Sequence, residues 1–152
     1  MLNALPDNTD VSLRLAALDS EDLAIISAHM QDALLRLADM RYLAKTRQFA
    51  FVSNRFAWER QPETQRRRSG LHFENVLKVQ HLGLNHLAPS DILSLLSITF
   101  EPGDEPAGHI VLTFSASRSI RLEVEYIDAR LKDLGGAWET QNIPRHDAPQ
   151  TS

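Results

Sequence analysis

The sequence contains no cysteine, so disulfide frameworks, thiolate zinc sites and cysteine nucleophiles are excluded. It also has no uninterrupted apolar stretch of the roughly 18 residues that a membrane-spanning helix needs. The first residues, MLNALPDNTD, lack the basic segment and apolar run of a secretory signal. These absences lead us to expect a soluble cytoplasmic protein that does not enter a membrane.

Familiar catalytic motifs are missing as well. The patterns GxGxxG, GxxxxGK[ST], GxSxG and HExxH do not occur. His81 and His86 lie close together in the sequence, but a two-histidine metal site needs a third ligand that the pattern does not supply. Glu123 and Glu125 share a strand parity with Arg121, which is typical of a solvated face. We therefore predict no catalytic residue, no cofactor and no metal site.

The composition is that of one globular domain, with 152 residues of which 43% are hydrophobic and 24% charged. A chain of this length buries about 68–70% of its unfolded surface, enough to fold without a metal or disulfide. Polar, proline-containing ends predict a flexible N-terminal arm over residues 1–10 and a loosely ordered tail over 139–152. The domain itself is expected to span residues 11–138.

Charge is unevenly distributed along the chain. The net charge of −4 divides into −5 over residues 1–40, +6 over residues 41–78 and −5 over residues 79–152. The basic block is a local feature of an acidic chain. This weakens the case for nucleic-acid binding, which depends on the positive field presented to phosphates.

Hydrophobic periodicity predicts one helix near the N-terminus. Alternation over residues 11–17 indicates a strand, and Asp19 then provides a helix N-cap. Apolar residues follow at helical spacing and predict a helix that continues to about Leu37 and covers a sheet. The stripe consists of Leu23, Ile26, Met30, Ala33, Leu34 and Leu37.

Most of the remaining chain is predicted to be β-strand. Strands are expected over residues 40–45, 48–59, 93–101, 109–114 and 120–126, with a weak one near 73–79. A bulge near Ser53-Asn54 would bring the aromatics of residues 49–58 to one side. Residues 127–134 either continue the last strand after a bulge or form a short helix. The prediction is an α+β fold with about seven mostly antiparallel strands in two meanders and one amphipathic helix after the first strand. A small, partly closed β-barrel with a helix is the alternative.

Several stretches resemble a bacterial family known as domain of unknown function 2948. They are RQFAFVSNRFAWE at 47–59, LSLLSITFEP at 93–102, IRLEVEYIDARLKDL at 120–134, and Trp138, Thr140, Pro144 and His146. The likeness covers about residues 12–146, and the NRFxWE run is its most specific part. The resemblance implies a single-domain bacterial protein without an assigned activity, and it implies no catalytic residue. Tyr126 stands where cysteine is expected in many relatives, which argues against a required thiol.

The segment FAWERQPETQRRRSG, residues 56–70, holds most candidate contact residues. Its arginines are expected in a loop between two strands, where they could contact a partner or phosphate. Phe56 and Trp58 could add a stacking surface, although we interpret Trp58 as a core aromatic. Glu59 and Glu63 interleave, and a charge run is usually a solvated face. The candidate contacts are Arg55, Arg60, Arg66, Arg67 and Arg68.

Three functional hypotheses remain open from the sequence. The first is a non-enzymatic protein-interaction or accessory module that binds a protein partner or a second copy of the chain. It is supported by the absent catalytic motifs, the segregated charge and an expected free sheet edge. The second is nucleic-acid or ribonucleoprotein binding through the basic 55–68 region. The third is a small enzyme of unknown reaction.

Overall fold

The structure, a computed structural model, describes residues 13–56 and 66–135. The predicted arm over 1–10, the predicted tail over 139–152, Trp58 and Arg60 lie outside these residues. In chain order the elements are β1 (Arg14–Ala17), α2 (Ser20–His29), β2 (Leu34–Arg36), the 3-10 helix η1 (Leu37–Asp39), β3 (Met40–Leu43), β4 (Gln48–Phe56), β5 (Arg66–Phe73), β6 (Val76–Leu82), β7 (Ile92–Pro102), β8 (Gly108–Phe114), β9 (Arg118–Val124) and β10 (Ala129–Asp133).

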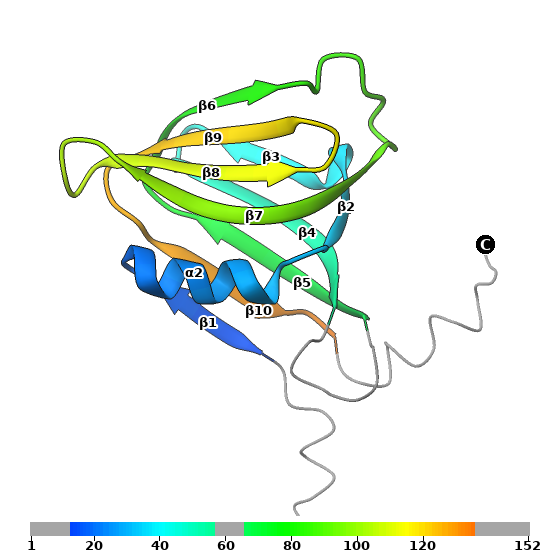
Figure 1. Cartoon of the computed structure of the whole chain (residues 1–152), viewed down its shortest axis with the longest axis horizontal. Coiled ribbons are helices and arrows are strands. Elements are labelled where there is room, and N and C mark those ends of the chain that lie inside the picture. Colours follow the sequence, from blue (N-terminus) through cyan, green and yellow to red (C-terminus); the bar gives the residue numbers. More distant parts are fainter. Residues whose placement is uncertain (1–12, 57–65, 136–152) are drawn as a thin grey trace, which may run out of the picture.

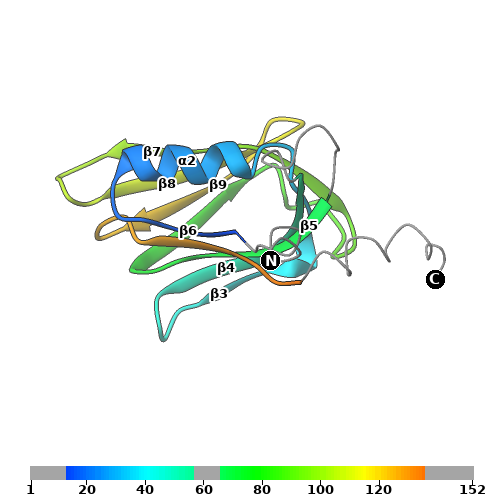
Figure 2. The same ribbon diagram turned by 90° about the horizontal axis from the view of Figure 1, so that it is seen from below.

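The strands form one ten-stranded antiparallel sheet in the order β1-β10-β5-β4-β2-β7-β8-β9-β6, with β3 also paired to β4. The sheet bends at β2, which pairs with both β4 and β7, so that its two parts face each other (Figures 1 and 2). We call β1, β10, β5, β4 and β3 the lower layer, and β7, β8, β9 and β6 the upper layer.

This architecture confirms the predicted antiparallel α+β fold with one helix. The prediction of about seven strands in two meanders is wrong. The runs β3–β4–β5 and β7–β8–β9 are each meanders, but the short strand β2 joins them into a single sheet. The alternative of a partly closed barrel is wrong too, because the sheet ends at β1 on one side and β6 on the other.

Helix α2 begins as the sequence predicts, because the Oδ1 of Asp19 accepts a hydrogen bond from the Asp22 amide at 2.8 Å. It ends at His29, well before the predicted end at Leu37. Asp32 has a positive φ of 66°, which ends the helical path. The Asp32 amide then donates to the Leu95 carbonyl at 2.7 Å, which draws the chain into pairing with β7. Tertiary pairing therefore overrides the helical spacing of the last apolar residues.

The core lies between the two layers, and α2 covers one side of it by packing on β7 and β1 (Figure 1). Leu23 and Ile26 are the helix residues that become buried. Alternate strand residues point inward from both layers, as expected for sheets with one packed face. These buried residues include Phe49, Phe51, Leu71, Phe73 and Leu131 from the lower layer and Ile110, Leu112, Phe114, Ile120, Leu122 and Val124 from the upper layer.

Strand β4 runs without the predicted bulge near Ser53-Asn54. Each residue from Phe49 to Phe56 pairs in unbroken register with β5. Ser53 and Arg55 therefore continue the inner face begun by Phe49, whereas Phe56 points outward. Two other predictions along this hairpin are wrong: residues 66–68 lie in strand β5 rather than in a loop, and the weak strand near 73–79 is divided between β5 and β6.

Candidate functional site

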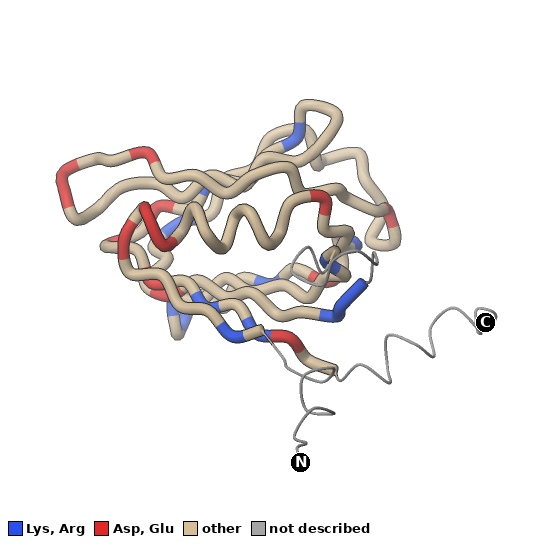
Figure 3. The backbone as a smooth tube through the Cα atoms, turned by 60° about the horizontal axis from the view of Figure 1, so that its bottom comes forward, with Lys and Arg blue, Asp and Glu red and all other residues tan. Residues whose placement is uncertain are grey.

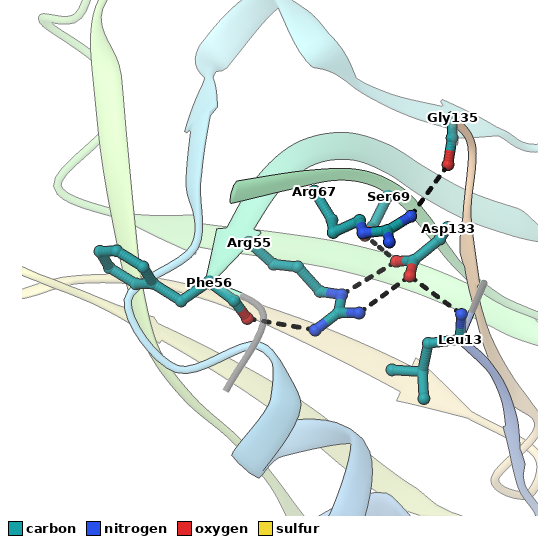
Figure 4. Close-up of polar contacts among 7 residues, drawn as sticks. All are labelled: Leu13, Arg55, Phe56, Arg67, Ser69, Asp133 and Gly135. Atoms are coloured by element: carbon teal, nitrogen blue, oxygen red, sulfur yellow. Dashed lines mark hydrogen bonds and ion pairs between the residues drawn. The ribbon is translucent and has the colours of Figure 1, made fainter. Parts of the chain in front are cut away.

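A buried polar network occupies the end of the lower layer, where β4, β5 and β10 run side by side (Figure 4). Arg55 donates from Nε to Asp133 Oδ1 and from Nη2 to Asp133 Oδ2, both at 2.9 Å. Ser69 Oγ donates to the same Oδ1 at 2.7 Å, and the Leu13 amide donates to Oδ2 at 2.9 Å. The carboxylate is thus shared by three strands and by the segment that leads into β1.

The network is ionic and almost fully shielded from solvent, since the Arg55 and Asp133 side chains are 0% and 1% exposed. Burial alone raises the pKa of the Asp133 carboxyl. Hydrogen bonds from Arg55, Ser69 and the Leu13 amide outweigh burial, so the pKa lies below its ordinary value. Asp133 therefore remains charged at neutral pH and holds the buried guanidinium in place.

The candidate arginines divide between the two faces of the sheet. Arg55 and Arg67 point inward, and Arg67 Nη1 donates to the Gly135 carbonyl at 3.3 Å. Arg66 points outward and lies 3.6 Å from the centre of the Phe56 ring, a cation–π contact. Desolvation in this half-buried position lowers the pKa of Arg66. Arg68 is exposed on the outer face, and Arg60 lies outside the described residues.

Outward-pointing cations cover the solvent side of the lower layer. The strand registers place them on one face, which we call the cationic face; it comprises Arg14, Arg41, Arg66, Arg68, Arg130 and Lys132. None of the outward positions on the described strands of this layer holds Asp or Glu. Figure 3 shows basic positions gathered along these strands, while α2 carries acidic residues in its first turn.

Most of this positive charge is not neutralised within the described part of the chain. Arg130 Nε lies 3.1 Å from Oδ1 of Asp128, in the segment just before β10. Arg14, Arg41, Arg68 and Lys132 form no ion pair with any residue in 13–56 or 66–135. Arg14 even stands directly across from Lys132 in the β1–β10 register. Like charges opposite each other destabilise a sheet, so the fold itself gains nothing from this arrangement.

A hollow of about 540 Å³ lies in the cationic face around Gly70, and we call it the Gly70 hollow. Its floor and walls are mainly apolar and its charged lining is mainly basic. The lining residues are Ala38, Asp39, Arg41, Leu43, Ala50, Phe51, Val52, Gly70, Leu71, His72, Lys132 and Leu134. A second hollow of about 240 Å³ shares Asp39 and Val52 with the first and is bordered by Arg36, Asn54 and Arg68. Together they form a depression along the outer side of β4.

The acidic residue between the hollows is itself neutralised. Arg36 Nη2 and Asp39 Oδ1 are 3.0 Å apart, and hydrogen bonding from Arg36 lowers the pKa of Asp39. A carboxylate with a lowered pKa is a poor general acid or base near neutral pH. The cationic face therefore presents apolar surface, guanidinium groups, an ammonium group, the His72 imidazole and a carboxylate that is paired with Arg36.

Metal-binding clusters and membrane-spanning helices are absent from the described residues. The described ranges contain no gathering of three or more His, Asp or Glu side chains able to hold a metal ion. No helix in this part of the chain has the length and apolarity to cross a bilayer. His81 and His86, the nearest approach to a metal pair in the sequence, are both exposed, on β6 and on the loop after it.

Fold and site together define an α+β domain with a bent antiparallel sheet and a cationic outer face. A family model described as "Protein of unknown function (DUF2948)" matches residues 13–146, so the chain belongs to that family. Comparisons with curated proteins and with solved structures found no match.

Sequence reasoning found Arg66 and Arg68 but not the other members of the cationic face. Arg14, Arg130 and Lys132 come from β1 and β10, outside the basic block of residues 41–78, and Arg41 lies at the start of that block on β3. A signal was present in the alternation of ARLKD at 129–133, where Arg130 and Lys132 share the parity opposite to Leu131. The antiparallel order that joins β10 to β5 is not visible in any local pattern.

Proposed function

We propose that the protein is a non-enzymatic interaction module that docks an acidic protein partner on its cationic face. The observation that carries this proposal is a sheet face on which several cations form no ion pair within residues 13–56 and 66–135, and whose strands place no carboxylate outward. These cations include Arg14 and Lys132, which stand opposite each other. An anionic partner would relieve that repulsion. It would also be steered to the face by the positive field.

An acidic protein fits this face better than a nucleic acid does. Proteins that bind single strands stack bases on exposed aromatic rings. On the described strands of the lower layer, Phe56 is the one Phe, Trp or Tyr residue at an outward position. The guanidinium of Arg66 already covers its ring. The Gly70 hollow instead offers apolar side chains, which match the apolar residues of a protein segment.

Binding also accounts for the described side chains better than catalysis does. Asp133, which has the most hydrogen-bond donors around it, is buried behind the sheet and does not line either hollow. Asp39 lines both hollows but is held as an anion by Arg36. His72 lines the Gly70 hollow, and its Nδ1 lies 2.7 Å from Glu74 Oε2. The residues that line this hollow include no Ser, Thr or Tyr hydroxyl that such a histidine could activate as a nucleophile.

The test is a pull-down of the tagged full-length protein from its own cell lysate, with and without nuclease, in parallel with two charge variants. Arg68→Gln with Lys132→Gln removes cations from the cationic face. Lys78→Gln with Arg121→Gln removes one lysine and one arginine from exposed positions of the upper layer and is the matched control.

We expect an acidic protein that survives nuclease, that is lost from the cationic-face variant and that is retained by the control. Retention should also weaken as salt rises through the physiological range, because exposed charges are screened. Partners that disappear on nuclease treatment would establish the nucleic-acid alternative. Equal retention by both variants would refute the proposed docking face.

A further inference from the structure

We propose that the Gly70 hollow receives an apolar side chain flanked by carboxylates, so that the recognised segment is acidic with an apolar anchor. This inference rests on the proposed function and specifies the partner's chemistry. It makes the hollow the source of specificity and the surrounding cations the source of attraction.

The absence of a side chain at Gly70 is the first observation that supports an apolar anchor in the hollow. It lies in the interior of β5, paired with Val52 on one side and Lys132 on the other. Glycine in the middle of a strand weakens it and often marks a bulge, a bend or the close approach of a ligand or another backbone. The register with β4 and β10 is unbroken at Gly70, so no bulge accounts for it. Its φ is not positive, and a Cβ placed there would meet Leu134 at an ordinary 3.6 Å. The fold would therefore accept a side chain at this position, whereas the hollow would lose its floor.

The surroundings of Gly70 are the second observation. Leu43 and Leu134 are 43% and 48% exposed although both are large and apolar, and both line the hollow. Ala50 and Val52 complete an apolar surface between them. Its volume of about 540 Å³ is ample for one large side chain. An apolar surface of this kind, rimmed by polar groups, is typical of a docking site.

Charge complementarity identifies the flanking groups of the partner segment. Arg41, on β3, and Lys132, on β10, both line the hollow and form no ion pair in the described part of the chain. Carboxylates on either side of an apolar residue would meet these cations while the residue itself enters the hollow. A guanidinium binds such a carboxylate through paired hydrogen bonds.

The experiment measures fluorescence anisotropy of labelled probes with the full-length protein. The probes are a short Glu/Ser peptide with a central leucine, the same peptide with a central alanine, and an oligo-dT strand. We expect the leucine peptide to bind about tenfold more tightly than the alanine peptide, the effect of half-burying the extra carbons of leucine. Both peptides should bind more tightly than oligo-dT.

Gly70→Val and Gly70→Ala fill the floor of the hollow to different extents. Gly70→Val should reduce the leucine preference to less than about twofold, with Gly70→Ala intermediate, because the anchor no longer has space. Binding of the alanine peptide should stay unchanged. Thermal melting checks folding, and both variants should melt at or above the wild-type temperature because glycine is removed from a strand interior.

The arms separate the two proposals. If Gly70→Val keeps the tenfold leucine preference while Arg68→Gln with Lys132→Gln weakens both peptides, the anchor is wrong and the cationic docking face stands. If Arg68→Gln with Lys132→Gln binds both peptides as tightly as wild type does, both the cationic docking face and the anchor that rests on it are refuted. Tighter binding of oligo-dT than of either peptide would overturn the acidic-protein chemistry in favour of nucleic acid.

Discussion

Replacing Asp133 by asparagine should destabilise the protein strongly, although the two side chains have the same shape. The substitution leaves the Arg55 guanidinium, which is 0% exposed, without its carboxylate. Removing one partner of a buried ion pair typically costs about 3–5 kcal/mol, because the remaining charge is uncompensated. Domains of this size unfold with about 5–15 kcal/mol in total, so the loss would be at least about a fifth of the stability.

Two further variants isolate the cause of this loss. Glu101→Gln breaks the ion pair between Glu101 and Arg121, whose side chains are 55% and 48% exposed, respectively. This loss should cost about 0–1 kcal/mol. Arg55→Met combined with Asp133→Asn removes both charges. The double variant should be more stable than Asp133→Asn alone by at least about 1 kcal/mol, because the Arg55 guanidinium is no longer buried without its carboxylate.

Urea unfolding followed by circular dichroism measures these differences. With a slope near 1.5 kcal/mol/M, the midpoint of Asp133→Asn should fall by about 2–3 M relative to wild type. The slope itself should not change, since the same surface is exposed on unfolding. An Asp133→Asn midpoint equal to that of Glu101→Gln would refute the buried pair as a main stabilising contact, as would a double variant less stable than the single one.

Three other measurements test separate parts of the structure. Folding lowers the pKa of the Asp133 carboxyl, so its contribution to stability is complete above about pH 4, the ordinary pKa, and is lost as pH falls through the folded pKa. Wild-type urea midpoints should therefore fall more steeply below about pH 4 than those of Asp133→Asn. Asp19→Ala removes the helix cap seen at the Asp22 amide and should cost about 1 kcal/mol in chemical unfolding; no change would contradict the cap. Gly108→Ala would place a Cβ 2.5 Å from the Glu101 carbonyl oxygen and 2.6 Å from Phe100 Cζ. This overpacking should cost about 1–3 kcal/mol, visible as a lower melting temperature. A Gly108→Ala protein as stable as wild type would mean that these contacts relax freely.

The sequence predicted those elements whose signals are local. Asp19 marks the helix start, and the alternation of Ile110, Leu112 and Phe114 gives a strand whose inner face is buried in the structure. The end of the helix was missed because the signal is tertiary. Residues 33–36 keep helical spacing, yet hydrogen bonds to Leu95 and pairing with β7 hold them as a strand. The short strand β2 is also why two expected meanders form one sheet.

The candidate site was only partly predictable for a similar reason. Arginine is usually exposed, so a local reading places all the arginines of residues 55–68 on the surface. Parity along an unbroken strand instead sends Arg55 inward to Asp133, a partner far away in the sequence. A bulge would have been needed to return the aromatics to one face. No bulge is needed, because the buried carboxylate of Asp133 neutralises Arg55 on the inner face of the sheet.

The inner network and the cationic face are built from the same strands. Arg67 and Arg68 are neighbours in β5 that point to opposite sides, and Asp133 follows Lys132 in β10 in the same way. The carboxylate of Asp133 joins β4, β5 and the approach to β1, so it fixes the strands that carry the outward cations. Their like charges would otherwise favour separation of β1 from β10. The ion pair and hydrogen bonds of Asp133 on the inner side thus hold together the strands that carry the cationic face. That face is unfavourable for the isolated fold and suited to an acidic partner.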